Sequence, residues 1–511
     1  MGLVDAYSIA SLLRVGESTA KAIGSPEGAP PLGYRDLVEL VSRNVDRMNE
    51  LGLGRGDRVA SVIANGPEAA TAFLCIAAGA TAAPLNPAYR HDEFHFYLAD
   101  LKAKALVVEA GVDSPARTAA RELGVPVVDL HPRREKGAGW FTLEPLEPMA
   151  GRPARDGFGE GDDTALVLHT SGTTARPKIV PLLQRNLLAS ARHIAAALAL
   201  GPADVCLNVM PLFHIHGLMA GTLASLAAGA EVCCAPHFNA LKFFAWLDEA
   251  KPTWYTAVPT MHEAALARAE RHREVCARAR LRLVRSSSAR LATRVMKELE
   301  TTFGAPVIES YGMTETAHQI TSNPLPPGKR EPGSVGTAAG PEVGIMDEEG
   351  ELLPVGYEGE VVVRGRNVMV GYENNPEANA KAFCQGWFRT GDQGFLDGEG
   401  RLRITGRLKE LINRGGEKIS PSEVDEVLMH HEGVQQAVTF ALRHDKLGEE
   451  VAAAVVMREG EATTDHELRD YLALHLAPFK VPRRIVFVRE IPRGATGKLQ
   501  RIGLAKKLGL E

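Results

Sequence analysis

The sequence of 511 residues predicts an α/β protein with more than one domain. Short apolar runs alternate with stretches of helical periodicity between residues 36 and 308, a pattern typical of parallel sheets covered by helices. From Gly333 on, short β runs are broken by Gly and acidic turns, which indicates a smaller β-rich subdomain. We therefore expect a large N-terminal domain of stacked α/β subdomains plus a β-rich subdomain, followed by a small α+β C-terminal domain.

The N-terminal alternation predicts its elements in order. Helical spacing of apolar residues predicts helices at 36–51 and 67–78, and resumes at 182–200. Apolar runs predict strands at 57–63, 81–85, 103–110, 125–130, 164–168, 204–210, 231–235, 253–258, 281–284 and 306–308. Residues 131–162 are rich in Pro, Gly and charge, so a surface excursion is expected there.

The stretch 205–230 contains no Asp, Glu, Lys or Arg. Polar side chains, Pro211 and several Gly residues interrupt it, so we expect a buried strand, loop and helix rather than a membrane span. In the β-rich subdomain, strands are predicted at 344–346, 360–364 and 402–405.

A domain boundary is predicted within residues 406–410, which divides the chain into residues 1–408 and 409–511. Beyond it, the strings Ser420-Pro421-Ser422-Glu423 and Thr464-Asp465-His466-Glu467 have the pattern of capping boxes. They predict helices at 421–431 and 465–476, and apolar runs predict strands at 434–442, 451–457 and 484–488.

Charge and cysteine content exclude several classes of function. A net charge of −5 with scattered Lys and Arg provides no basic surface for nucleic acid. The six Cys form neither a C-x-x-C pair nor a metal-binding set with His, so we expect reduced thiols. No signal peptide is recognisable. These features favour a cytoplasmic protein without stable membrane insertion, a monomer or a homodimer.

The stretch from Leu168 to Lys178 combines hydroxyl groups, one Gly and one Lys after an apolar strand. We interpret it as a loop between a strand and a helix, in which N–H groups, hydroxyls and an ammonium can converge on phosphate oxygens. Composition alone favours an ordinary surface loop rich in Ser and Thr. Three later strands also run into polar segments, at 211–217, 285–290 and 309–315. Because ligands bind beyond the carboxyl ends of parallel strands, these exits point to one crevice.

The string from Leu168 to Lys178 resembles the signature loop of adenylate-forming enzymes, the family of acyl-CoA synthetases, luciferases and peptide-synthetase adenylation domains. The strings at 311–315, 387–392 and 492–498 are similar to further motifs of that family. The resemblance spans about residues 36–501 and is closest to oxalate–CoA ligases and plant coumarate–CoA ligases. It implies an acid–CoA ligase that uses ATP, Mg²⁺ and coenzyme A and proceeds through an acyl-adenylate.

The resemblance also implies a nucleotide site. Thr170, Ser171, Gly172, Thr173, Thr174 and Lys178 would bracket the β- and γ-phosphates. Ser288, Ala289, Glu309, Ser310, Tyr311, Gly312 and Met313 would line the nucleotide. Thr314 would contact the α-phosphate and Glu315 would hold Mg²⁺. Asp392 would accept hydrogen bonds from the ribose hydroxyls, with Arg407 as the second ribose contact.

For catalysis, the family resemblance implies roles for Lys498 and Thr314, with Lys498 bridging the carboxylate and the α-phosphate. Lys409 stands at the family's hinge, about which a mobile C-terminal domain would rotate for the thiol step. Coenzyme A would then meet Arg414, Gly415, Gly416 and Lys418, although the two glycines also suit a hairpin turn. No general base is assigned, and His214 is left as a candidate.

The predicted acyl pocket is polar, with His214, His216, Ser288, Arg290 and His318. Such a lining favours a small acid with a second polar group, oxalate being the example that the resemblance suggests. Arg290 departs from that subfamily, which has a small residue there. The histidines can equally satisfy backbone groups in a core. Short-chain, medium-chain or aromatic acids, a carrier-protein acceptor, a luciferase-type oxidase and a nucleotide-binding scaffold stay open as alternatives.

Overall fold

The computed structural model describes residues 7–149, 151–170, 177–493 and 499–510. Its first sheet has seven strands in the order β7-β6-β5-β3-β4-β8-β9, parallel except at its two edges. These strands are β3 (Arg58–Val62), β4 (Thr81–Pro84), β5 (Ala105–Glu109), β6 (Val127–Pro132), β7 (Phe141–Pro145), β8 (Thr164–Thr170) and β9 (Lys178–Leu183). The stretch 131–162 is therefore not only a surface excursion, because β7 returns from it to pair with β6.

The second sheet has nine strands in the order β16-β15-β14-β13-β12-β10-β11-β1-β2. Its strands are β1 (Lys21–Gly24), β2 (Leu32–Gly33), β10 (Val205–Asn208), β11 (Glu231–Cys234), β12 (Trp254–Ala257), β13 (Leu283–Ser286), β14 (Val307–Tyr311), β15 (Thr321–Ser322) and β16 (Thr337–Ala338). The strands from β14 to β1 in this order are parallel, so their carboxyl ends lie at one edge.

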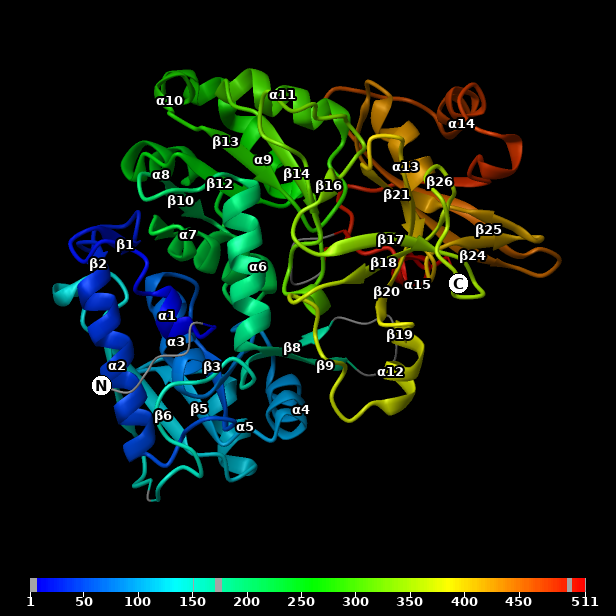
Figure 1. Ribbon diagram of the computed structural model, residues 1–511. Coiled ribbons are helices and arrows are strands. Elements are labelled where there is room, and N and C mark those ends of the chain that lie inside the picture. The colour runs from blue at the N-terminus through cyan, green and yellow to red at the C-terminus, as the bar shows by residue number, and fades with distance from the viewer. Residues whose placement is uncertain (1–6, 150, 171–176, 494–498, 511) are drawn as a thin grey trace.

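Helices fill the space between the two sheets and cover their outer faces, as Figure 1 shows. The inner helices are α1 (Ile9–Leu12), α2 (Tyr34–Glu50), α3 (Pro67–Gly79), α6 (Gln184–Ala197), the π-helix η2 (His216–Leu223) and α7 (Ala224–Ala227). The outer ones are α4 (His91–Leu101), α5 (Pro115–Glu122), α8 (Phe243–Ala250), α9 (Pro259–Ala269), α10 (Arg273–Arg278) and α11 (Thr293–Phe303). This arrangement confirms the predicted stacked α/β architecture.

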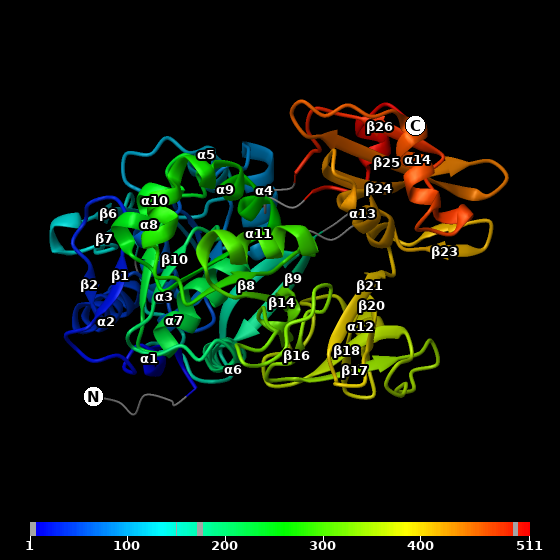
Figure 2. The ribbon, with the colours of Figure 1, turned by 90° about the horizontal axis from the view of Figure 1, so that it is seen from above.

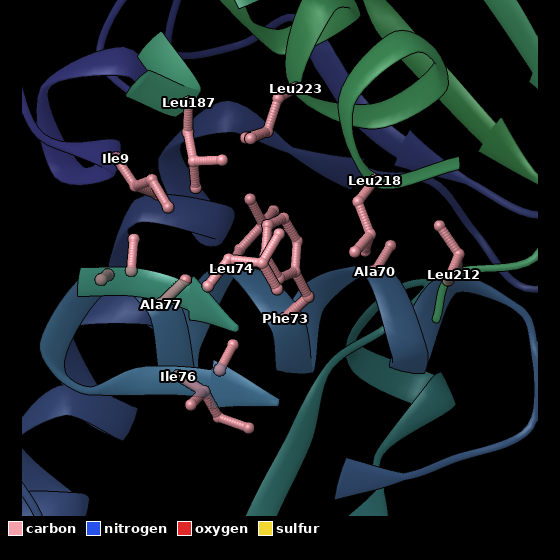
Figure 3. Packing of buried hydrophobic residues seen from close by; sticks show 14 of the residues in the cluster. Ile9, Ala70, Phe73, Leu74, Ile76, Ala77, Leu187, Leu212, Leu218 and Leu223 are labelled. Atoms are coloured by element: carbon pink, nitrogen blue, oxygen red, sulfur yellow. The ribbon is translucent and has the colours of Figure 1, made fainter. Parts of the chain in front are cut away.

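Helix α3 is the centre of this core, because all of its residues are buried. Its Phe73 and Leu74 lie among side chains of α6 and η2, such as Leu187 and Leu223 (Figure 3). A helix that is apolar on every face is typical of a protein interior. Packing at this density fixes the two sheets relative to each other, and with them the loops at their edges.

The third sheet is antiparallel and forms the predicted β-rich subdomain. It contains β17 (Glu342–Met346), β18 (Gly359–Arg364), β19 (Phe383–Cys384), β20 (Trp387–Leu396) and β21 (Leu402–Arg407), and α12 (Pro376–Ala382) precedes β19. Short 3₁₀ turns stand at η1 (Arg134–Lys136), η3 (Glu270–His272), η4 (Thr314–Thr316) and η5 (Pro478–Lys480). None of the helices in the described part of the chain is long and apolar enough to cross a membrane.

The fourth sheet begins after β21 and belongs to the C-terminal unit, which lies beside α11 and the third sheet in both views (Figures 1 and 2). Its strands are β22 (Ile412–Arg414), β23 (Glu417–Ile419), β24 (Val434–His444), β25 (Gly448–Met457) and β26 (Arg484–Phe487), with α13 (Pro421–His430), α14 (Asp465–Ala473) and α15 (Leu504–Lys507).

Of the two predicted capping boxes, the structure forms one. Thr464 accepts from the N–H of Glu467, whose carboxylate accepts from the N–H of Thr464. Ser420 makes no such cap: its hydroxyl donates to the carbonyl of Thr405, and Glu423 instead pairs with Lys480. The first prediction was wrong because these tertiary partners compete with the local bonds of a capping box.

Candidate functional site

The polar segments after β10, β13 and β14 meet at one edge of the second sheet, as predicted. His216, on the segment after β10, lies with its Nδ1 3.0 Å from the Oγ of Ser288, which follows β13. The Ser287 hydroxyl donates to the carbonyl of Ser310 in β14 at 2.9 Å. These contacts join the three exits directly, because their parallel strands lie close together in the sheet.

The loop that resembles a phosphate-binding signature joins two strands rather than a strand and a helix. Thr170 at the end of β8 lies opposite Lys178 at the start of β9, and α6 follows β9. Ser171, Gly172, Thr173 and Thr174 lie outside the described residues. The prediction of a helix directly after the loop was wrong, because the apolar residues of β9 merge into the periodicity of α6.

Lys178 faces an aromatic ring and, beyond it, the candidate metal ligand. Its Nζ lies 4.2 Å from the ring centroid of Tyr372, whose hydroxyl donates to Oε1 of Glu315 at 2.8 Å. Burial raises the pKa of the Glu315 carboxyl, while burial and the nearby charge of Lys409 lower the pKa of Lys178. Sequence reasoning missed Tyr372, because no pattern distinguishes an aromatic residue in this segment.

The residues around Glu315 fit a magnesium ion that is held mainly by a nucleotide. The described residues contain no group of three or more His, Cys, Asp or Glu side chains able to hold a metal. Mg²⁺ commonly takes one or two carboxylates and completes its shell with phosphate oxygens and water. One buried carboxylate beside the Lys178 ammonium therefore matches a phosphate-bound Mg²⁺ better than a dedicated protein cage.

Asp392 is held by two donors, which bring the second and third motifs together. Its Oδ2 accepts from the Tyr311 hydroxyl at 2.6 Å and its Oδ1 from Nε of Arg407 at 2.8 Å. Asp392 in β20 lies opposite Arg407 in β21. The carboxylate raises the pKa of Arg407, and burial beside this charge raises the pKa of Tyr311. Asp392 is thus a fixed acceptor next to Tyr311 and Arg407.

The segment from Glu309 to Met313 forms a tightly packed wall beside these residues. The Glu309 carboxyl is buried, accepts from the N–H of Leu291 at 3.1 Å, and has a pKa raised to about 7 by burial. A Cβ at Gly312 would lie 1.4 Å from the carbonyl oxygen of His318, so only glycine fits there. Thr314 opens the short helix η4 and is half-buried, whereas Ala289 is exposed.

Two residues of the predicted acyl pocket, His216 and His318, gather around an arginine that the sequence did not single out, and a third, Ser288, contacts His216. Nη1 of Arg285 lies 3.4 Å from Nε2 of His216 and 3.4 Å from Nε2 of His318, and the two imidazole rings are 4.8 Å apart. The Arg285 side chain is fully buried in β13. It was missed because it stands after the predicted strand 281–284, at the start of a polar segment, where an arginine is usually exposed.

The two other predicted pocket residues lie differently. His214 is half-buried, two residues before His216. Arg290 forms an ion pair with Glu426 of α13, in the C-terminal domain. The structure thus places Arg290 at the domain interface, which departs from its expected place in the acyl pocket.

The predicted C-terminal site residues lie on and next to one hairpin. Gly415 and Gly416 form the turn between β22 and β23 with φ of +62° and +99°, so the hairpin alternative is correct. Arg414 pairs with Glu450, and Lys418 with Glu348 across the domain boundary. Lys409 precedes β22, and Lys498 lies outside the described residues.

Comparison with known families places this site in context. Residues 22–373 match the family model described as AMP-binding enzyme, and residues 423–498 match the one described as AMP-binding enzyme C-terminal domain. The chain belongs to the AMP-binding enzyme family. The resemblance that the motifs indicated is thereby confirmed.

Relatives within the AMP-binding enzyme family match nearly the whole chain. An oxalate–CoA ligase from Arabidopsis thaliana is 44% identical, covering 93% of both proteins, and one from Saccharomyces cerevisiae is 40% identical, covering 95% of this chain and 94% of that protein. A sulfoacetate–CoA ligase from Cupriavidus necator is 38% identical, covering 89% and 88%.

Among solved structures, ATP-bound MatB from Rhodopseudomonas palustris aligns with a TM-score of 0.87 at 29% identity, over 99% of both chains. The fold is therefore that of this family. The comparisons also confirm the expected class, an AMP-forming acyl-CoA synthetase that uses ATP and coenzyme A.

Proposed function

We propose that this enzyme forms the coenzyme A thioester of a small carboxylic acid that carries a second anionic group, and that oxalate is the first acid to test. The observation that carries the proposal is the buried Arg285. Its side-chain partners among the described residues are His216, His318, Thr256 and Gln319. None of them is a carboxylate.

An unpaired buried cation is costly. Burial lowers the pKa of Arg285 to about 9, which leaves the guanidinium charged at neutral pH. A buried charge without a counter-ion costs several kcal/mol, and an anion bound nearby offsets part of this cost. A second anionic group on the substrate, next to His216, Ser288 and His318, would supply that charge. A fatty acid or an aromatic ring would not.

The names of two relatives support the same class of acid. Oxalate carries a second carboxylate and sulfoacetate a sulfonate, and the ligases named for them are 44% and 38% identical to this chain. Short-chain, medium-chain and aromatic acids stay as alternatives, as does a carrier-protein acceptor in place of free coenzyme A.

In the proposed first step, an oxygen of the substrate carboxylate attacks the α-phosphorus of ATP and the bond to pyrophosphate breaks. Lys178 and Thr314 would hold the phosphates, Asp392 and Arg407 the ribose, and Lys498 would bridge the two reacting groups. A Mg²⁺ ion held by Glu315 and the phosphates would neutralise charge on the leaving pyrophosphate.

In the proposed second step, the thiol sulfur of coenzyme A attacks the acyl carbon, the bond to AMP breaks, and the thiol proton passes to solvent. The residues at 409–511 would rotate about Lys409 between the steps, bringing the hairpin of Arg414, Gly415, Gly416 and Lys418 to the thiol. We also propose that the enzyme is cytoplasmic and is either a monomer or a homodimer.

The test is pyrophosphate release from a panel of acids, with and without coenzyme A. Oxalate and sulfoacetate are compared with acetate, hexanoate and coumarate. We expect the highest kcat/KM for one of the two dianions, with thioester formed only when coenzyme A is present. A higher kcat/KM for any of the monoanions would contradict the proposed acid class. Acyl-AMP that accumulates despite coenzyme A would favour a carrier-protein acceptor.

A further inference from the structure

The contacts around Arg285 also fix where the protons of two histidines lie. Nη1 of Arg285 is 3.4 Å from Nε2 of both His216 and His318, and its Nη2 is 3.3 Å from Oε1 of Gln319. A guanidinium has only hydrogen-bond donors. Nη1 also lies 3.4 Å from Oγ1 of Thr256. Because the guanidinium only donates, we take each Nε2 as an acceptor, which puts the proton of each neutral ring on Nδ1.

This assignment passes from His216 to the half-buried Ser288. With its proton on Nδ1, His216 donates to Oγ of Ser288 at 3.0 Å, while its Nε2 also accepts from the Thr256 hydroxyl at 2.6 Å. The hydroxyl of Ser288 then accepts from His216, so its own hydrogen is available to another acceptor. Ser288 adopts a left-handed backbone conformation with φ of +72°, which is uncommon outside glycine and typical of functional sites.

We propose that Arg285 is a positioning residue, which holds His216 and His318 as neutral Nδ1–H tautomers so that the Ser288 hydroxyl donates to a carboxylate of the substrate. The inference rests on the proposed function in one respect, namely that the acid binds at Ser288. Arg285 itself is fully buried, so it acts through the two imidazoles and not by direct contact. A group that binds to the Ser288 hydroxyl in this arrangement must accept a hydrogen bond, as a carboxylate oxygen does.

Two other titratable groups near Arg285 do not change charge near neutral pH. Burial raises the pKa of the Cys206 thiol in β10 and lowers that of His262 in α9 to about 3. Protonating His216 or His318 would place an imidazolium next to the guanidinium, and the two positive charges would repel each other. The new Nε2–H group would also face an N–H group of Arg285, so that two donors would meet without an acceptor. Without Arg285, this opposition is removed, so a proton on Nε2 of either ring costs less free energy.

The test compares Arg285→Met, Arg285→Lys and a control, Arg282→Met. Arg282 lies just before the same strand, β13, and pairs with Asp204, away from the histidines. For each enzyme, kcat/KM for the best acid of the panel is measured between about pH 6 and pH 8. We expect the wild type and the control to share one profile, which includes any contribution of Glu309, whose pKa is about 7. For Arg285→Met, we expect a loss of about tenfold or more and a new titration in this range, with the KM for ATP unchanged. Arg285→Lys keeps a donor and should recover part of the loss.

A second readout needs no substrate: the ¹⁵N shifts of His216 and His318, assigned with His216→Gln and His318→Gln variants. We expect both rings protonated at Nδ1 in the wild type, and mixed or doubly protonated in Arg285→Met. His214 is unchanged in all of these variants, so its own ¹⁵N signals are present in every spectrum. Wild-type rings protonated at Nε2, or an Arg285→Met enzyme that keeps the wild-type pH profile, would overturn the inference. The proposed acid fails separately, if neither dianion is a substrate.

Discussion

Glu309 shows how a single buried carboxyl links stability to pH. Its folded-state pKa, about 7, lies above the ordinary value of 4.5 for an exposed Glu, so the fold favours the protonated form. Stability is therefore full below about pH 4.5 and falls as the pH rises through about 7. We predict that Glu309→Gln, which keeps an acceptor for the N–H of Leu291, raises the free energy of unfolding at pH 8 by roughly 3 kcal/mol and leaves it nearly unchanged at pH 5.

The measurement is urea unfolding of the wild type and the Glu309→Gln variant at both pH values. A control, Glu342→Gln, removes a carboxyl that lies at the surface and pairs with Arg364. It should not become more stable at pH 8 relative to pH 5. An equal effect of Glu309→Gln at both pH values would show that packing, and not ionisation, dominates at this position.

The sequence identified some residues of the candidate site and missed others. Tyr311, Thr314, Glu315 and Asp392 stand in strings that resemble family motifs, and the same resemblance pointed to Arg407. The structure joins Tyr311, Asp392 and Arg407 by hydrogen bonds. Arg285 and Tyr372 stand in no such string, and their importance comes from partners distant in sequence, such as His318 and Lys178. No local pattern contains that information, because tertiary contacts decide which buried polar group meets which.

At the scale of elements, the segment from Arg366 to Glu373 connects the hairpin of β8 and β9 to the rest of the site. The side-chain amide of Asn186 in α6 donates to the carbonyls of Arg366 and Val368, and the N–H of Glu373 donates to the carbonyl of Ile179 in β9. Tyr372 then lies between Lys178 of β9 and Glu315 of η4. Strand β9 thereby brings its ammonium to the candidate metal ligand.

Two substitutions at Tyr372 separate its two contacts. Tyr372→Phe keeps the ring under Lys178 but removes the hydrogen bond to Glu315, which favours the ionised carboxylate. We predict that it raises the Mg²⁺ concentration for half-maximal activity by a few-fold, because less of Glu315 is ionised near neutral pH. Tyr372→Leu also removes the cation–π contact, worth about 1 kcal/mol, and should raise the KM for ATP by roughly fivefold as well.

Both parameters come from pyrophosphate release measured over a range of Mg²⁺ and ATP concentrations. Tyr255→Phe is the matched control, since this buried tyrosine bonds to His262 in the outer core and lies apart from the nucleotide residues. An unchanged Mg²⁺ requirement in Tyr372→Phe would remove the hydrogen bond to Glu315 from the mechanism.

The sequence predicted elements best where one face or all faces are apolar. Helix α3 and strands β3, β5 and β12 lie within one or two residues of their expected bounds. The prediction was wrong where two patterns adjoin, as at β9 and α6, and where a long connection hides an edge strand, as at β7. The Ser420 capping box was wrong for a different reason, because a carbonyl in another element, at Thr405, competes for the hydroxyl.

At the scale of the whole molecule, the two domains meet through polar contacts. Arg290 pairs with Glu426 of α13, Lys418 with Glu348, and Gln436 bonds to Glu263. Such contacts are weak individually and exchange readily with water. An interface of this kind is compatible with a C-terminal domain that changes its position during the proposed reaction, since no hydrophobic cluster of the described residues spans both domains.

We predict that the Arg290–Glu426 pair shifts the balance between the two proposed half-reactions, because the proposed rotation about Lys409 would break it. Its side chains are 36% and 33% exposed, so the pair contributes only about 0.5–1 kcal/mol after screening by solvent, a factor of about two to five. Arg290→Ala and Glu426→Ala should each change the ratio of adenylate formation to thioester formation by that factor, and Arg290→Glu with Glu426→Arg should restore it.

Rapid-quench assays of each half-reaction measure the ratio, and Lys480→Ala, which breaks a pair to α13 within the C-terminal domain, is the control. Because salt screens partly exposed charges, the difference between wild type and Arg290→Ala should fade at high ionic strength. A ratio that stays the same in both single variants at low salt would mean that the pair accompanies this arrangement without stabilising it.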